Sequence, residues 1–146
     1  MNHKSILLVE DNPQDELLTL RSLRRINVAN QIDVVRDGQQ ALDYLFGVGE
    51  FASRAGAALP TVVLLDIGLP RLSGLEVLER LRADPSTRLL PVVILTSSDE
   101  ENDRLASYAQ GANSYVRKPL DFGEFAETVA RLGVYWLATN EPLPPR

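Results

Sequence analysis

Residues 5–13, SILLVEDNP, combine an apolar strand, two acidic residues and a helix start in one short stretch. The apolar half is rich in branched side chains, which is typical of a strand covered on both faces of a parallel sheet. Asn12 followed by Pro13 indicates a helix start, because asparagine caps helices and proline suits their first turn. Glu10 and Asp11 are therefore predicted to lie between a buried strand and a helix.

The order of strand and helix repeats along the chain. Further buried strands are predicted at residues 61–65 and 91–95, and shorter strands at residues 33–35 and 114–116. Apolar residues at helical spacing lie between these runs, so strands and helices alternate about five times. This alternation predicts an α/β fold with one parallel sheet, right-handed crossovers and helices on both faces.

The predicted helices are marked by apolar residues that repeat on one face. These residues are Leu17, Leu20 and Leu23; Ala41, Leu42, Leu45 and Phe46; Leu75, Leu78 and Leu81; Leu105 and Ala109; and Phe122, Phe125, Val129, Leu132 and Trp136. The third helix is expected to stop near Asp84 and the fourth at Gly111. Asp121 with Glu124 predicts a capping box at the start of the last helix.

Length and composition indicate one ordinary globular domain. The 146 residues are 45% hydrophobic and 24% charged, which suits a single buried core. We expect this domain over residues 1–137 and a flexible C-terminal tail over residues 138–146, which is rich in proline. Gly47 to Pro60 is the one long loop that the pattern predicts.

Charge and residue types exclude several kinds of function. The net charge of −5 predicts no nucleic-acid binding, because an acidic chain repels phosphate backbones. The chain has no cysteine and only one histidine, His3, which excludes disulfides, zinc–cysteine sites and histidine-dependent triads. No apolar run has the length of a membrane span, and we expect a cytoplasmic location. A bound metal must be a hard cation held by oxygen atoms.

Polar side chains follow four of the predicted strands. Glu10 and Asp11 follow the first strand, Asp66 the third, Thr96 the fourth and Lys118 the fifth. Because the carboxyl ends of parallel strands meet at one edge, where ligands bind, these side chains are expected to share a site. Carboxylates packed together repel one another unless a cation such as Mg²⁺ neutralises them. The set predicts Mg²⁺-dependent phosphoryl transfer to Asp66, the central carboxylate.

Each of these residues also has an ordinary structural interpretation. Glu10 and Asp11 suit the positive end of a helix dipole, Asp66 can open a turn, and Thr96 can begin a helix cap. Lys118 can be a solvated strand end. Their joint placement after four successive strands favours the functional interpretation.

The chain resembles the receiver domains of two-component response regulators from Ser5 to about Leu137. The motifs that carry the resemblance are Leu8-Val9-Glu10-Asp11-Asn12, Leu65-Asp66-Ile67-Gly68-Leu69-Pro70, Leu95-Thr96-Ser97 and Val116-Arg117-Lys118-Pro119. The resemblance implies a flavodoxin-like, doubly wound sheet of five parallel strands in the order 2-1-3-4-5. That order makes the first and third strands neighbours.

The resemblance implies a phosphoacceptor and a metal site. Asp66 is the expected phosphoacceptor, and Asp11 and Asp66 are the expected side-chain ligands of Mg²⁺. Glu10 is expected to act through a water molecule, and the backbone carbonyl of Gly68 to supply the remaining protein ligand. Gly68 places no side chain beside the phosphoryl group, which leaves the lifetime of the phosphorylated state open.

Three further positions match the family's switch machinery. Thr96 and Lys118 match its hydroxyl and lysine, which contact the phosphoryl group. Tyr115 matches the aromatic switch position, which turns inward when Thr96 moves toward the phosphoryl group. The Lys118–Pro119 peptide bond is expected to be cis, because proline lowers the cost of that isomer.

The resemblance implies a signalling phosphoacceptor, not an enzyme, that assists its own phosphorylation and dephosphorylation. Its phosphodonor would be a sensor histidine kinase. More narrowly, the chain resembles stand-alone regulators of bacterial and cyanobacterial phytochrome kinases in three features: Asn12-Pro13, the Gly47–Pro60 loop and the ending Val134-Tyr135-Trp136-Leu137.

Phosphorylation is expected to change the face of the fourth helix, fifth strand and fifth helix, and thereby the binding of a downstream protein. The same face or the C-terminal helix is expected to form a homodimer. The alternative for Trp136 is packing on its own core.

Other functions fit the sequence less well. A flavodoxin-like cofactor binder needs a phosphate-binding loop where this chain has two acids, and a dinucleotide-binding enzyme needs a glycine-rich fingerprint. An aspartate-based phosphatase needs a second aspartate two residues after the first, where this chain has Gly68. A phosphate sink and a scaffold receiver that is never phosphorylated stay open as alternatives.

Overall fold

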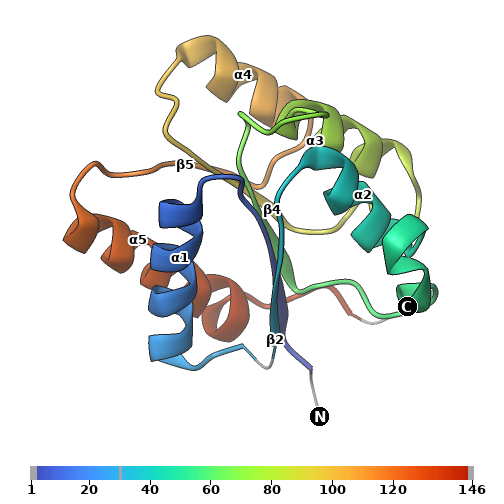
Figure 1. The fold of residues 1–146 in the computed structure, drawn as a ribbon, viewed down its shortest axis with the longest axis horizontal. Coiled ribbons are helices and arrows are strands. Elements are labelled where there is room, and N and C mark those ends of the chain that lie inside the picture. Colours follow the sequence, from blue (N-terminus) through green and yellow to red (C-terminus); the bar gives the residue numbers. More distant parts are fainter. Residues whose placement is uncertain (1–2, 30, 145–146) are drawn as a thin grey trace.

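The computed structural model describes residues 3–29 and 31–144 and contains a five-stranded parallel sheet. The strand order is β2-β1-β3-β4-β5, which confirms the predicted order 2-1-3-4-5 (Figure 1). The strands are β1 (Ser5–Val9), β2 (Gln31–Val35), β3 (Val62–Leu65), β4 (Val92–Thr96) and β5 (Ser114–Arg117). All neighbouring strands pair in parallel, as expected for strands connected by crossover helices.

Helices cover both faces of this sheet, as the alternating pattern predicts. The helices are α1 (Pro13–Ile26), α2 (Gly38–Phe46), α3 (Gly74–Ala83), α4 (Glu101–Ala109) and α5 (Phe122–Val134). Figure 1 shows α1 beside α5 on one side of the sheet and α2 beside α3 on the other, with α4 next to α3. This arrangement leaves the carboxyl ends of the strands open to the loops that follow them.

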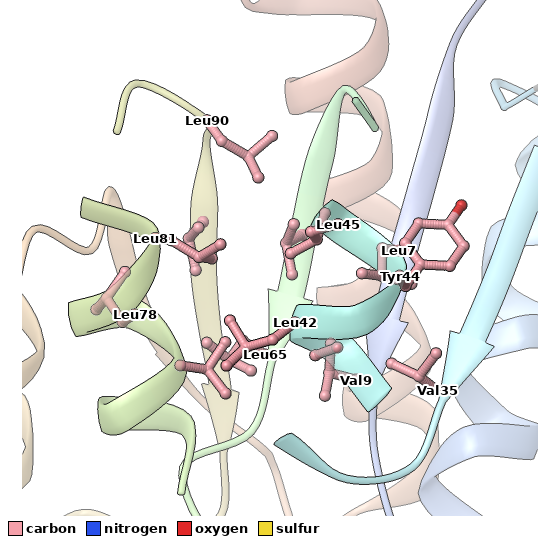
Figure 2. Packing of buried hydrophobic residues seen from close by; sticks show 14 of the residues in the cluster. Leu7, Val9, Val35, Leu42, Tyr44, Leu45, Leu65, Leu78, Leu81 and Leu90 are labelled. Atoms are coloured by element: carbon pink, nitrogen blue, oxygen red, sulfur yellow. The ribbon is translucent and has the colours of Figure 1, made fainter. Parts of the chain in front are cut away.

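The core has two layers because successive strand residues point to opposite faces. Leu7 and Val9 of β1 pack with α2 and α3, whereas Ile6 and Leu8 pack with α1 and α5. Figure 2 shows the first layer, in which leucine side chains of α2 and α3 meet the sheet. Every residue of β3 and β4 is buried, and apart from Thr96 at the end of β4 all of them are apolar.

The contact between α1 and α5 depends on Gly133. A Cβ atom at this position would lie 2.8 Å from Cδ1 of Ile26 and 2.9 Å from Cδ2 of Leu23. Just beyond, Leu137 is buried and Trp136 is half-buried against the same core layer. The own-core alternative for Trp136 is therefore confirmed.

Four of the apolar residues that mark the predicted helices are exposed and not buried. Leu17 in α1 is 50% exposed, Leu105 in α4 is 64% exposed, Phe122 in α5 is 67% exposed, and Ala109 in α4 is also on the surface. α4 buries only Ser107, because it packs on the molecule with a narrow face. Helical spacing of apolar residues indicates a helix, but it does not show how deeply that helix is buried.

The predicted capping box at the start of α5 is also wrong. The Asp121 side chain accepts a hydrogen bond from the backbone N–H of Gly123, and Glu124 does not return one. The capping box is at α3 instead, where Ser73 and Glu76 cap each other's backbone N–H groups. Glu76 is the third residue of that helix, which is the position the motif requires.

The long predicted loop contains a short 3₁₀ helix, η1 (Gly49–Arg54). Its Arg54 guanidinium lies 3.7 Å from the ring centre of Tyr44, and the Tyr44 hydroxyl donates a 2.6 Å hydrogen bond to Asp33. The first contact attaches the loop to α2, and the second attaches α2 to β2.

The C-terminal end of the fold extends slightly beyond the predicted domain boundary at residue 137. A π-helical turn, η2 (Tyr135–Thr139), continues α5, so the helical structure ends at residue 139. Residues 141–144 form neither helix nor strand, and residues 145–146 lie outside the described residues. The flexibility of the tail over residues 138–146 stays a prediction. Across residues 3–29 and 31–144, no helix has the length and apolar content needed to cross a membrane.

Candidate functional site

The site lies at the carboxyl edge of the sheet, where backbone hydrogen bonds continue the strand pairing by one residue. The N–H of Asp66 donates to the carbonyl oxygen of Val9 (3.2 Å), and the N–H of Lys118 donates to that of Thr96 (2.7 Å). These bonds hold Asp66 and Lys118 in the register of the sheet itself. A cavity of about 670 Å³ opens above them and is lined mainly by acidic and hydroxyl side chains.

The start of α1 orients two more acids toward this edge. Oδ1 of Asn12 accepts hydrogen bonds from the N–H groups of Gln14 (2.9 Å) and Asp15 (3.0 Å), which confirms the predicted cap. The N–H of Asn12 donates to Oε2 of Glu10 (3.1 Å). A single asparagine thus fixes the end of β1 and the first turn of α1 relative to each other.

Lys118 binds three carboxylates. Its Nζ lies 2.6 Å from Oε1 of Glu10, 2.8 Å from Oδ2 of Asp15 and 2.9 Å from Oδ2 of Asp66. Burial alone would lower the pKa of Lys118. Hydrogen bonds to Asp15 and Glu10 and the charge of Asp66 outweigh that effect and raise the pKa above its ordinary value. The ammonium therefore stays charged over the physiological pH range.

Asp66 is oriented through both of its carboxylate oxygens. Oδ1 accepts hydrogen bonds from the hydroxyl of Thr96 (2.8 Å) and from the N–H of Gly68 (3.2 Å), and Oδ2 accepts from Lys118. The carboxylate borders the cavity, so another molecule can reach it from solvent. Such fixed donors are the preorganised electrostatics that phosphoryl transfer requires.

The acidic residues can hold a metal ion. Oxygen atoms of Glu10, Asp11 and Asp66 all lie within 4.8 Å of one another. Burial raises the pKa of Glu10 to about 7, although its hydrogen bond to Lys118 opposes that increase. Together with Asp15, these residues bring four carboxyl groups and one ammonium into the same site, so acidic groups outnumber the cation. An all-oxygen set with this charge fits a hard divalent cation such as Mg²⁺.

Tyr115 lies next to the site and does not line its cavity. Its hydroxyl donates to the backbone carbonyl of Ser98 (2.9 Å), two residues beyond Thr96, and its ring packs partly buried against the core. The Ser98 hydroxyl in turn donates to Asp103 in the first turn of α4 (2.6 Å). Tyr115 therefore connects β5 to the loop that joins Thr96 to α4.

The predicted cis bond between Lys118 and Pro119 is wrong. No cis peptide bond occurs within residues 3–29 and 31–144, so this bond is trans. Proline lowers the cost of the cis isomer, but the trans isomer keeps a preference of about 0.5–1 kcal/mol.

The structure brings together the predicted side chains Glu10, Asp11, Asp66, Thr96 and Lys118. Sequence reasoning missed Asp15, which contributes a third carboxylate to Lys118. A signal for Asp15 was present, because the cap at Asn12 places it in the first turn of a helix that starts at the sheet edge. That turn follows the acidic pair directly.

Comparison with known proteins agrees with this geometry. The family model described as "Response regulator receiver domain" matches residues 6–130. The probable methanogenesis regulatory protein FilR2 of Methanothrix harundinacea is 39% identical over 96% of this chain and 88% of its own length. The response regulator Rcp1 of Synechocystis is 34% identical over 93% of this chain and 90% of its own length.

Solved structures show the same fold over nearly the whole chain. Phosphorylated RcpA, a cyanobacterial phytochrome response regulator, superposes with a TM-score of 0.90 at 36% identity, covering 97% of this chain and 99% of RcpA. The Mn²⁺-bound form of Rcp1 has a TM-score of 0.89 at 33% identity, with the same coverage. The bacteriophytochrome response regulator RtBRR is 49% identical, with a TM-score of 0.77 over 98% of this chain and 86% of RtBRR. With its sheet order and acidic cavity, the chain belongs to the response regulator receiver domain family.

Proposed function

We propose that this receiver accepts a phosphoryl group on Asp66 from the phosphohistidine of a sensor kinase. The observation that carries the proposal is that the Asp66 carboxylate accepts three hydrogen bonds, from Thr96, Gly68 and Lys118. An Asp66 oxygen forms the new P–O bond as the P–N bond of phosphohistidine breaks. The electron pair of the broken bond stays on the imidazole nitrogen.

The residues around Asp66 have separate tasks in this transfer. Lys118 and Thr96 each hydrogen-bond an Asp66 oxygen, so both are placed to donate to oxygens of the incoming phosphoryl group. Asp11 and Asp66 would hold Mg²⁺ directly, Glu10 through a water molecule, and Gly68 through its backbone carbonyl. When bound, Mg²⁺ neutralises part of the negative charge on the transferring group. Its use here is supported by the acidic cluster and by the Mn²⁺-bound form of the related Rcp1.

We propose that the response leaves the site through Tyr115 and α4. Movement of Thr96 toward a phosphoryl group shifts the loop at Ser98, where the Tyr115 hydroxyl is bound. The surface of α4, β5 and α5 would then change and be recognised by a downstream protein. The added phosphoryl charge would shift the balance between two conformations of this surface toward one of them.

The kinase is proposed to be a phytochrome kinase because RcpA and RtBRR carry that description. FilR2 is named for methanogenesis, so the choice of kinase needs a direct experiment. Transfer from a purified bacteriophytochrome kinase should be faster than transfer from an unrelated histidine kinase at equal concentration. Equal rates from the two kinases would contradict this partner.

The function can be tested by intact-mass analysis after incubation with acetyl phosphate. We expect the wild-type protein to gain one phosphoryl group with Mg²⁺ and none with excess chelator. Asp66→Asn should gain none, and Asp11→Asn should need far more Mg²⁺. Asp84→Asn, which changes an acid outside the site, should behave as wild type. An unmodified wild-type protein in saturating Mg²⁺, or full modification of Asp66→Asn, would contradict the proposal.

Assembly and location stay predictions. A homodimer through the α4–β5–α5 face or the C-terminal helix is compatible with the exposed Leu105, Tyr108, Val134 and Tyr135. Sedimentation of the phosphorylated and unphosphorylated protein would measure any such dimer. A cytoplasmic location follows from a cytoplasmic kinase domain as phosphodonor, and fractionation of cells would test it.

A further inference from the structure

Lys118 uses its whole hydrogen-bonding capacity on carboxylates. An ammonium has three N–H donors, and the three partners are Glu10, Asp15 and Asp66, all within 2.9 Å of Nζ. Glu10 and Asp66 also belong to the cluster that can hold a metal ion, whereas Asp15 does not. Of the three partners of Lys118, Asp15 is therefore the one that would not also bind the cation.

A bound cation and the Lys118 ammonium would compete for the same oxygens of Glu10 and Asp66, but not for those of Asp15. In the cluster, the oxygens of Glu10 and Asp66 would turn toward a bound divalent cation, whose charge would also repel the ammonium that shares them. Lysine is a point charge on a flexible stem with four carbon atoms, so a lysine that loses its partners can swing into solvent. Phosphoryl transfer requires the ammonium to stay at the acceptor.

The position of Asp15 suits it to hold Lys118. It is the third residue of α1, and its backbone N–H is fixed by Asn12 at 3.0 Å. Its side chain is 25% exposed, compared with 2% for Glu10 and 11% for Asp66, so it is the most exposed of the three carboxylates that bind the ammonium. Lys118 comes from the loop after β5, and Asp15 thus connects α1 to that loop across the site.

We propose that Asp15 is a positioning residue that holds the Lys118 ammonium beside Asp66 when a cation occupies the acidic cluster. The inference rests on the proposed phosphorylation of Asp66. Asp15 touches neither the phosphoryl group nor the metal ion, and it acts through Lys118.

Asp15→Asn removes the charge that holds Lys118 and keeps the size of the side chain. The matched control is Glu16→Gln, because Glu16 lies on the same helical turn, pairs with Arg36 and does not contact Lys118. Both variants remove one negative charge from the start of α1, so effects on the helix dipole are shared. Asp15→Glu tests whether a carboxylate alone restores the function.

Three measurements separate the possibilities. The first is the Mg²⁺ affinity, from titration of the metal-free protein. The other two use the Mg²⁺-loaded protein: the rate of phosphorylation by acetyl phosphate, and the ¹⁵Nζ NMR signal of the Lys118 ammonium, which is visible when the ammonium is held and exchanges slowly. For Asp15→Asn we expect a roughly tenfold slower rate, because a misplaced group costs that much or more in transfer. We also expect loss of the Lys118 signal, and an Mg²⁺ affinity within about twofold of wild type because Asp15 is not one of the carboxylates that can hold the cation.

Glu16→Gln should match the wild type in all three measurements, and Asp15→Glu should recover part of the rate. A wild-type rate or an intact Lys118 signal in Asp15→Asn would overturn the inference. Loss of Mg²⁺ affinity as large as that of Asp11→Asn would also overturn it, because Asp15 would then be a metal ligand. If the wild-type protein takes up no phosphoryl group, the proposed function fails, and the Lys118 signal still decides the role of Asp15.

Discussion

The helices α3 and α4 follow neighbouring strands of the same sheet but pack very differently. α3 buries Val77, Leu78 and Leu81 completely in the core. α4 buries only Ser107 and leaves Leu105 largely in solvent. The two helices also begin differently, since α3 has a full capping box, whereas Glu100, the residue before α4, makes no side-chain capping bond.

The loops before these two helices, which begin at Asp66 and Thr96, also differ in how firmly they are held. The loop after Asp66 is fixed, because the N–H of Gly74 donates to the carbonyl oxygen of Ile67 (2.8 Å) and Gly74 packs against the backbone of Asp66. The loop after Thr96 is held mainly by side chains of Ser98 and Tyr115.

We infer that the phosphoacceptor rests on a rigid element and that the hydroxyl beside it leads to a loosely packed one. Chemistry requires fixed geometry, whereas a signalling surface must be able to change. The firmly packed α3 provides the fixed geometry, and the loosely packed α4 provides a surface that can change.

The largest expected effect comes from truncating equivalent leucines in the two helices. Leu81→Ala should lower the free energy of unfolding by about 2–5 kcal/mol, because it opens a cavity in a filled core. Leu105→Ala should change it by no more than about 0.5 kcal/mol, because that side chain is already in solvent. Urea denaturation of both variants measures the contrast. Equal losses would show that α4 is packed as firmly as α3.

A smaller effect is expected from adding a methyl group at glycine. A Cβ at Gly74 would overlap the backbone of Asp66, so Gly74→Ala should destabilise the protein by about 1–3 kcal/mol and slow phosphorylation. Gly123→Ala in α5 should be neutral or stabilising, since its nearest neighbour is the Asp121 carboxylate at 3.5 Å. Thermal unfolding and the acetyl phosphate assay report both properties. A fully active and stable Gly74→Ala would remove the basis for a rigid phosphoacceptor loop.

The smallest expected effect concerns the helix starts. Ser73→Ala removes the cap of α3 and should cost about 1 kcal/mol of stability. Glu100→Ala, at the corresponding place before α4, should cost almost nothing because the Glu100 side chain makes no capping bond. Hydrogen exchange should show faster opening at the start of α3 only in Ser73→Ala. An equal cost for both variants would mean that α4 has a cap which its geometry does not reveal.

Most of the site could be predicted because short stretches of sequence mark the strand ends and the helix start that form it. Each central strand contains an apolar run, so the first polar residue after that run, such as Asp66 after Leu65 or Thr96 after Leu95, marks the sheet edge. Asn12 and Pro13 likewise mark the start of α1 within a few residues of Glu10. Parallel pairing then brings these ends together without further information.

The remaining features depend on contacts between distant segments. Asp15 has the local appearance of an ordinary acid at a helix start, and its partner Lys118 lies 103 residues away. The exposure of Leu105 depends on how α4 packs, which helical spacing does not encode. The choice of Ser73 with Glu76 over Asp121 with Glu124 as the capping box depends on side-chain geometry at each helix start.

The pairing of Glu10 with Lys118 joins residues that are 108 positions apart, and Lys118 follows β5, an edge strand of the sheet. A chain that is still being synthesised has Asp66 long before it has Lys118. Until β5 joins β4, Asp66 lacks its ammonium partner, and the phosphoacceptor site is incomplete. Competence to receive a signal therefore arrives with the final strand. We therefore expect a copy that ends before Lys118, or in which β5 is unpaired, to keep Asp66 and yet accept the phosphoryl group poorly.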